Sequence, residues 1–211
     1  MEQKAYWDSV SNEKNFTTPF QKDLFMAYVP KKARVVDIGC GYGRTLEELH
    51  QLGYSDLLGL DFSDGMIQRG KELYPHLDLQ VKKSDTIDLP DESADAVILF
   101  AVLTCIIQDD AQRFLIDEIK RVLRPGGILY VNDFLLNDDE RNLQRYAQFA
   151  EEYGCYGVFR LPEGAEVRHH DRSWVETLLS GFEQKEFQPL TFTTMNGNKS
   201  NGFCYIGKCL K

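Results

Sequence analysis

Three glycines and an acid near the start of the chain have the types and spacing of a nucleotide-binding loop. Gly39, Gly41 and Gly43 stand at alternate positions after the apolar run Val35–Ile38, which contains Asp37. Glycines at such a turn allow unusual backbone angles, and they let a ligand approach the main chain without a Cβ in the way. Leucines at helical spacing follow, and the N–H groups at the start of that helix would attract an anionic group. The pattern predicts a strand, a loop for a nucleotide-like ligand, and a helix.

Two further acids follow the next two predicted strands. Asp61 ends an apolar run and lies 18 residues after Gly43, close to where the acid after a glycine loop binds ribose hydroxyls. Capping of the next helix is the alternative role for Asp61, but Ser63 is the better cap and leaves Asp61 for the ribose. Asp85 comes after the alternating strand pattern of residues 77–81.

The spacing of the glycine loop separates two classes of cofactor. The dinucleotide fingerprint G-x-G-x-x-G would have a third glycine where Arg44 stands, and it does not require Asp37. Asp37 with the three glycines instead resembles motif I of the class I S-adenosylmethionine-dependent methyltransferases. The resemblance continues to about Val131. The run Ala94–Phe100 resembles motif IV, and the Leu-Arg-Pro-Gly-Gly turn at 123–127 is frequent in the family.

This resemblance implies a cofactor and the residues that bind it. The cofactor is S-adenosyl-L-methionine, and the product is S-adenosyl-L-homocysteine. By resemblance, Asp85 would accept the adenine amino group, and the strand end at Phe100 would face the reactive methyl. The implied cofactor-binding residues are Asp37, Gly39, Cys40, Gly41, Gly43, Arg44, Asp61, Phe62, Met66, Asp85, Thr86, Phe100 and Ala101.

The order of the predicted elements indicates an α/β fold. Alternating strand and helix signals require a mostly parallel sheet, and the apolar run 94–100 is typical of a central strand buried on both faces. Residues 186–194 and 202–209 are predicted to pair antiparallel across Asn196-Gly197-Asn198, after a helix opened by a capping box at Ser173–Glu176. We expect a doubly wound fold like that of class I methyltransferases, in three α/β/α layers. Its seven-stranded, mostly parallel sheet would end in a C-terminal antiparallel hairpin.

The length of 211 residues fits a single methyltransferase domain, 1–211. We divide it into an N-terminal helical or lid segment (1–32), a cofactor-binding core (33–133), a substrate-cap insertion (134–172) and a C-terminal helix with hairpin (173–211). For residues 5–19 two interpretations stand: a helix that packs on the domain, or a lid over the cofactor, as resembling methyltransferases often have.

The composition of the chain limits the classes of molecule that it is expected to bind. The net charge of −9 opposes binding to nucleic acid and favours a small-molecule substrate. We expect no membrane association, because no apolar run is long enough and the first 30 residues do not resemble a signal peptide. Five cysteines without a C-x-x-C motif predict reduced thiols and a cytoplasmic protein. The spacing of the four histidines predicts no metal site, and the oligomeric state is left open.

The segment 134–172 has a composition of its own. Five arginines and two histidines lie among aromatic residues there, in a chain that is otherwise acidic. The planar fork of arginine suits bidentate recognition of carboxylate or phosphate. Alternatively, these arginines pair with neighbouring acids on solvated helix faces. The predicted substrate-binding residues are Thr104, Arg141, Arg145, Tyr146 and Arg168.

The predicted reaction transfers a methyl group to a small molecule that carries a carboxylate or phosphate. The cofactor carries the activation, so the protein mainly aligns the reactants. His169 and His170 are candidate general bases because imidazole titrates near neutral pH, although solvated loop histidines are the alternative. Tyr6 is a further catalytic candidate. Two other function classes are a nicotinamide-dependent oxidoreductase and a non-catalytic S-adenosylmethionine-binding module without a pocket beside the methyl.

Overall fold

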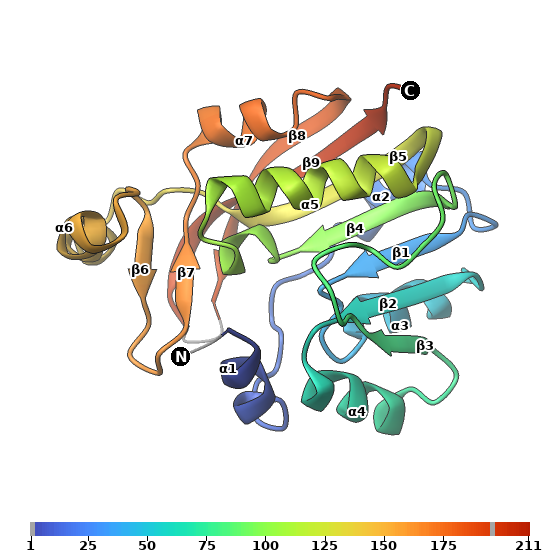
Figure 1. The fold of residues 1–211 in the computed structure, drawn as a ribbon, viewed down its shortest axis with the longest axis horizontal. Helices are drawn as coiled ribbons and strands as arrows, with labels where there is room; N and C mark the ends of the chain where they lie inside the picture. Colours follow the sequence, from blue (N-terminus) through green and yellow to red (C-terminus); the bar gives the residue numbers. More distant parts are fainter. Residues whose placement is uncertain (1–2, 195–196) are drawn as a thin grey trace.

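A seven-stranded sheet in the order β3-β2-β1-β4-β5-β9-β8 forms the centre of the molecule (Figure 1). The computed structural model describes residues 3–194 and 197–211. Strands β1 to β5 run parallel, and β9 pairs antiparallel with both β5 and β8. The strands are β1 Val35–Ile38, β2 Leu57–Asp61, β3 Asp78–Val81, β4 Ala94–Phe100, β5 Leu123–Phe134, β8 Phe182–Thr193 and β9 Lys199–Cys209. This confirms the predicted class I methyltransferase-like fold.

Helices cover both faces of the sheet. Apolar residues of α5 and α7 pack on one face, and those of α2, α3 and α4 pack on the other. The two layers are separate hydrophobic cores, as expected for parallel strands that are buried on both sides. The helices are α1 Gln3–Val10, α2 Lys22–Tyr28, α3 Arg44–Gln51, α4 Asp64–Leu73, η1 Leu103–Cys105 (a single 3₁₀ turn), α5 Asp109–Val122, α6 Glu140–Tyr153 and α7 Arg172–Leu178. Among the described residues, no helix is both long enough and apolar enough to cross a bilayer.

The segment after β5 forms a small unit beside the sheet. It consists of α6 and an antiparallel pair, β6 Val158–Arg160 and β7 Glu166–Arg168, which the strand patterns did not predict. The chain beyond β7 returns to the end of β5, where Leu135 and His170 form an isolated parallel bridge. In Figure 1, α6, β6 and β7 lie on the side toward which the arrowheads of β1 and β4 point, with α1 nearby. We call residues 134–172 the cap.

Three local predictions need correction. Helix α7 begins at Arg172, and its cap is Asp171, whose carboxylate accepts from the Ser173 N–H at 2.7 Å. The predicted capping box is therefore wrong, because an ionised side chain two residues earlier takes the Ser173 amide and hydroxyl. Both strands of the C-terminal hairpin begin earlier than predicted. Strand β5 already begins at Leu123, within the predicted Leu-Arg-Pro-Gly-Gly turn, and its pairing with β4 has an irregular register between Ala94 and Ala96. Asn196 of the predicted turn lies outside the described residues.

Candidate active site

A single cavity of about 240 Å³ connects the glycine loop to the cap. Its wall is formed by the N-terminal segment, the carboxyl ends of β1, β2 and β4, and the cap. Ligands of open α/β sheets bind at this end of the strands. The predicted site residues that line the cavity are Tyr6, Asp37, Gly39, Cys40, Gly41, Arg44, Asp61, Phe62, Met66, Phe100, Ala101, Thr104, Arg141, Arg145 and His169.

The glycine loop has the backbone that its sequence predicts. Gly39 and Gly41 adopt φ values of 72° and 55°, a left-handed conformation that favours glycine. The Gly41 N–H donates to an Asp61 carboxylate oxygen at 2.9 Å, so the loop is attached to the end of β2. A Cβ at Gly41 would lie 2.4 Å from the Phe16 ring. The Phe16 ring therefore lies directly against the main chain of the loop, on the cavity side.

Asp61 holds the loop as well as lining the cavity. Its second carboxylate oxygen accepts from the Ser63 N–H at 2.8 Å. Ser63 in turn caps α4 by accepting from the Met66 N–H at 3.1 Å, which confirms it as the helix cap. Burial raises the pKa of Asp61, and the two backbone N–H groups oppose that rise. The carboxylate is thus preorganised at the position where the sequence predicts a ribose contact.

Asp37 has a buried carboxyl group, and one of its oxygens lacks a hydrogen-bond partner among the described residues. Its side chain is 1% exposed, and its Oδ1 has no partner among the described residues. Burial raises its pKa to about 8, the negative charge of Asp61 adds to the rise, and Arg44 opposes it. A buried polar atom without a partner is costly unless a ligand supplies one. Asp61 and this orphaned oxygen, beside the glycine loop, fit a ligand that combines hydroxyls with positive charge, as S-adenosylmethionine does.

The end of β4 is strained where it enters the cavity. Ala101 has φ 56°, a left-handed conformation that is uncommon for a residue with a Cβ. Its N–H donates to the Asn132 carbonyl at 2.8 Å, which holds the turn in place. Such strain concentrates at functional sites. The sequence has no signal for it, because alanine carries no turn preference.

An N-terminal strap, residues 11–19, crosses the glycine loop. Phe16 stacks on Tyr42 with ring centroids 5.0 Å apart and an interplanar angle of 8°. Arg69 donates to the carbonyls of Ser11 and Lys14, and Arg44 donates to the Thr18 carbonyl. The strap therefore lies on the cofactor side of the cavity. Its action as a lid stays a prediction.

Two of the five cap arginines reach the cavity. Arg141 and Arg145 lie one turn apart on α6, which Asp139 caps by accepting from the Asn142 N–H. The Arg145 guanidinium lies 3.6 Å from the centroid of the Phe159 ring. Its Nε is buried without a partner among the described residues, and burial lowers its pKa. Arg145 thus presents a positive charge to the cavity with part of its hydrogen-bonding capacity unused.

The other three cap arginines are engaged elsewhere. Arg160 pairs with Glu152 and Glu166 near the surface, and Arg172 pairs with Glu176. Arg168 is buried, but it donates to Asp109 at 2.6 Å and stacks over Trp174. Unlike the prediction, Arg168 does not line the cavity, because its charge joins the cap to α5. The sequence could not separate these arginines, because their partners come from distant elements.

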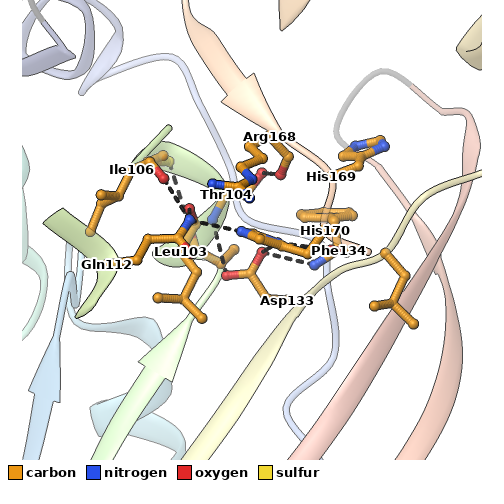
Figure 2. A network of polar contacts seen from close by, with 12 residues as sticks. Leu103, Thr104, Ile106, Gln112, Asp133, Phe134, Arg168, His169 and His170 are labelled. Carbon is orange, nitrogen blue, oxygen red and sulfur yellow. Dashed lines mark hydrogen bonds and ion pairs between the residues drawn. The ribbon is translucent and has the colours of Figure 1, made fainter. Parts of the chain in front are cut away.

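The two histidines differ, although they are adjacent. His170 donates from Nδ1 to the Phe134 carbonyl at 3.1 Å, and its Nε2 accepts from Gln112 at 2.9 Å. Burial lowers the pKa of His170 to about 4. Figure 2 shows His170 within this network and His169 apart from it, beyond Phe134. His170 is therefore not a base in the cavity, since both of its nitrogens are occupied by the protein.

Thr104, a predicted substrate-binding residue, makes its hydrogen bonds within the protein. Thr104 lines the cavity, but its hydroxyl donates to the Arg168 carbonyl at 2.8 Å (Figure 2). Its N–H donates to the buried carboxyl of Asp133 at 3.3 Å, and burial raises the pKa of Asp133 to about 7. Thr104 therefore positions the cap on the turn after β4.

Four other residues that the sequence predicts to be in the site do not line the cavity. Asp85 and Thr86 lie exposed in the loop after β3, so no contact supports the predicted adenine acceptor. A Cβ at Gly43 would face Leu79 in the core, so this glycine serves packing. Tyr146 is buried behind His169 rather than in the cavity. Among the described residues, no group of three or more His, Cys, Asp or Glu side chains could hold a metal ion.

Most of the apolar wall of the cap has no signal in the sequence. Its residues come from the end of β5, from β6–β7 and from the turn between them, and only their three-dimensional proximity identifies them. The aromatic residues of the N-terminal segment were the one available signal for the strap. The missed lining residues are Trp7, Lys14, Phe16, Thr17, Thr18, Thr45, Val102, Cys105, Phe134, Phe159, Leu161, Glu163, Ala165, Val167, Thr194 and Asn198.

Comparison with known proteins agrees with this geometry. Residues 36–131 match a family described as a methyltransferase domain. The chain resembles the crystal structure of an S-adenosylmethionine-dependent methyltransferase from Methanosarcina mazei, with a TM-score of 0.85, 25% identity, and coverage of 92% of this chain and 99% of that one.

Two curated relatives differ in what they act on. The 27-O-demethylrifamycin SV methyltransferase of Amycolatopsis mediterranei is 27% identical over 80% of this chain and 63% of its own length. The eEF1A lysine and N-terminal methyltransferase of Mus musculus is 28% identical over 50% of this chain and 16% of its own length. The chain thus spans less than two thirds of each of these relatives.

Proposed function

The chain belongs to the class I S-adenosylmethionine-dependent methyltransferase family, and from that premise we propose that it methylates a small molecule carrying a carboxylate or phosphate. Bound S-adenosylmethionine supplies a methyl group activated on a sulfonium centre. The residues of the chain then have three tasks: to bind the cofactor, to orient the acceptor, and to exclude water. Alignment of this kind lowers a barrier by about 7–11 kcal/mol. No catalytic triad is needed.

Cofactor binding is assigned to the carboxyl edge of β1 and β2. The Gly39–Gly41 backbone receives the ligand closely, and Asp61 accepts hydrogen bonds from ribose hydroxyls. The orphaned oxygen of Asp37 accepts from a positively charged part of the ligand, which explains why this oxygen is buried without a partner among the described residues. Phe62 and Met66 supply an apolar wall beside Asp61.

The acceptor is assigned to the cap end of the cavity, and Arg145 is the observation that carries this proposal. Its guanidinium is held against Phe159 and keeps an Nε without a partner among the described residues. Arg141 adds a second charge one turn away, and its described acidic partner, Asp139, lies 3.7 Å away and caps α6. A carboxylate or phosphate would satisfy both guanidinium groups.

The apolar lining of the cavity favours a small acceptor over a protein side chain. Apolar and aromatic residues of the cap form most of its far wall, including Phe134, Phe159 and Val167. Ligand sites of this kind enclose most of a small molecule and use few polar groups for orientation. The cavity beside the glycine loop also argues against a non-catalytic binding module. The nicotinamide alternative is set aside with the family assignment.

The test has two separable parts. Calorimetry with S-adenosylhomocysteine checks the cofactor site, and a methyl-transfer screen that measures S-adenosylhomocysteine release compares carboxylates, phosphates and their neutral analogues. We expect Arg145→Met to lower kcat/KM for the anionic acceptor about 10- to 150-fold, the value of a hydrogen bond to a charged group. Cofactor affinity should stay unchanged.

Arg172→Met is the matched control, because Arg172 is exposed and pairs with Glu176. It should change neither activity nor cofactor binding. Absence of S-adenosylhomocysteine binding to the parent protein would reject the proposed reaction. Turnover of neutral acceptors alone, or full activity of Arg145→Met, would reject the anionic acceptor and leave the reaction standing.

A further inference from the structure

His169 is held by the protein through one ring nitrogen. Its Nδ1 lies 2.5 Å from the Tyr146 hydroxyl and 3.1 Å from the Asn137 side-chain nitrogen. The Tyr146 hydroxyl already accepts from the Asn137 N–H at 3.3 Å, so its own proton is available to donate to Nδ1. The ring also packs between Phe134, with centroids 5.5 Å apart, and Phe159, with centroids 5.0 Å apart. The orientation of the imidazole is therefore determined.

The orientation of Asn137 is determined as well. Its Oδ1 accepts from the Asn201 N–H at 2.7 Å. Its Nδ2 lies 3.0 Å from the Leu135 carbonyl and 3.1 Å from the Ser200 hydroxyl, so its two hydrogens are shared between these acceptors and His169. The atom that faces His169 is therefore the amide nitrogen, which can donate and cannot accept. The Tyr146 hydroxyl and an amide nitrogen that cannot accept both face Nδ1, which favours the tautomer without a proton on Nδ1. In that tautomer the neutral ring carries its proton on Nε2.

Protonation of both nitrogens is disfavoured from every side of the ring. Burial lowers the pKa of His169 well below its usual value, and the charges of Arg145, His170 and Arg141 act in the same direction. The opposing carboxylate of Asp139 is occupied as the cap of α6. Among the described residues, no partner lies within hydrogen-bond distance of Nε2, although His169 lines the cavity. The ring thus offers the cavity one N–H donor and no lone pair.

We propose that His169 is a specificity-determining hydrogen-bond donor, whose Nε2–H binds an oxygen of the acceptor's carboxylate or phosphate beside Arg145, and that it is not the general base. This inference rests on the proposed function and deepens it by naming a third donor to the anion. Arg145 and Arg141 supply charge-assisted donors, and the neutral imidazole supplies a further, directional one. Phe134 and Phe159 flank the ring on the apolar wall, so the ligand class is such an anion on an aromatic or apolar body.

The tautomer can be measured without any substrate. Long-range ¹H–¹⁵N correlation spectra of the S-adenosylhomocysteine complex should show the His169 ring with a bare Nδ1 and a protonated Nε2 at every pH from 6 to 8. A spectrum with the proton on Nδ1, or a titration of this ring within that range, would overturn the proposal. His169→Leu identifies the resonance.

Benzoate is the binding probe, with phenyl phosphate and benzamide for comparison, on the same complex. We expect His169→Leu to weaken benzoate binding about tenfold. His169→Gln, which keeps an N–H at similar reach, should stay within about threefold of the parent. Benzoate and phenyl phosphate should both bind more tightly than the neutral benzamide, and the affinity for benzoate should be flat from pH 6 to 8.

Three results would count against the proposal. They are failure of both benzoate and phenyl phosphate to bind the parent complex, equal affinities of the parent and His169→Leu for these anions, and binding of benzamide as tight as that of benzoate. Circular dichroism and S-adenosylhomocysteine affinity show whether each variant keeps its fold. If S-adenosylhomocysteine itself does not bind, the proposed function fails, and the tautomer measured on the protein alone still decides the role of His169.

Discussion

The cofactor edge and the cap form one cavity, but their residues arrive there in different ways. At the cofactor edge, each acid or glycine stands at the end of a parallel strand, so Asp37, Gly41 and Asp61 meet because strands β1 and β2 are neighbours. In the cap, residues of the same type diverge: Arg145 faces the cavity, while Arg160 faces a surface acid. The position of a residue at a strand end follows from the order of the strands in the sheet. The direction in which a residue of a helix or hairpin faces depends instead on the elements that pack against it.

The largest effect of a substitution is expected at the cofactor edge, at Gly41. Gly41→Val should abolish binding of S-adenosylmethionine and S-adenosylhomocysteine, because a branched side chain at φ 55° would be strained and would strike the Phe16 ring. Calorimetry measures the loss, and circular dichroism should change little.

Gly53→Val is the matched control for Gly41→Val. Gly53 also has a positive φ, 93°, but it lies outside the cavity wall and a Cβ there would make only ordinary contacts with Lys31. This variant should lose some stability and keep cofactor affinity. If Gly41→Val binds as well as the parent, the loop serves packing alone.

Asp61 gives the next largest effect. Asp61→Ala should weaken binding by about 1.5–3 kcal/mol, because ribose hydroxyls lose a charged acceptor. The change also frees the N–H groups of Gly41 and Ser63. Asp61→Asn keeps one oxygen to accept from these groups and should lose less. Unchanged calorimetric affinity in Asp61→Ala, with the fold intact, would remove Asp61 from the site.

Asp37 predicts a pH dependence. Its pKa of about 8 means that the carboxyl is neutral at lower pH, whereas a positively charged ligand binds the ionised form. Affinity for S-adenosylmethionine should therefore rise with pH, by up to tenfold per unit, and level off above pH 8. Asp37→Asn should make the profile flat over this range. A parent profile without a slope would contradict the assignment.

The same carboxyl acts on the stability of the ligand-free protein with a defined sign. Its folded pKa lies above the usual value, so its contribution is complete below that value and is lost as pH rises through about 8. Urea unfolding of the parent and of Asp37→Asn should diverge in that direction. An opposite divergence would show that Asp37 is ionised in the ligand-free fold.

The smallest effect is expected in the cap, at Arg168. Arg168→Met should lower the free energy of unfolding by about 1.5 kcal/mol, because it removes the donor shared by Asp109 and the Ile107 carbonyl. Cofactor affinity should stay unchanged in calorimetry, since Arg168 does not reach the cavity. Arg172→Met, an exposed pair, should cost almost nothing. A large loss of cofactor affinity in Arg168→Met would show that the cap and the cofactor edge are coupled.

The sequence by itself determined the sheet, the glycine loop and the approximate place of Asp61, because strand period, turn chemistry and helix caps are local properties. Ser63 could be assigned as a cap because its partner is three residues away. The sequence also indicated that the cap was unusual in composition. It could not say which arginines face inward, since Arg168 meets Asp109 across 59 positions and Arg145 of α6 meets Phe159 of the unpredicted strand β6.

Tertiary structure alone decided the roles of the two histidines. His169 and His170 are neighbours in the chain, yet successive side chains of the extended segment point in opposite directions. One ring enters the network of Gln112 and Phe134, and the other meets Tyr146 and Asn137 at the cavity wall. Their protons are therefore placed by residues 23 to 58 positions away. A sequence motif cannot predict which ring nitrogen carries the proton, because the hydrogen-bond partners come together only when the cap packs against the sheet in the folded chain.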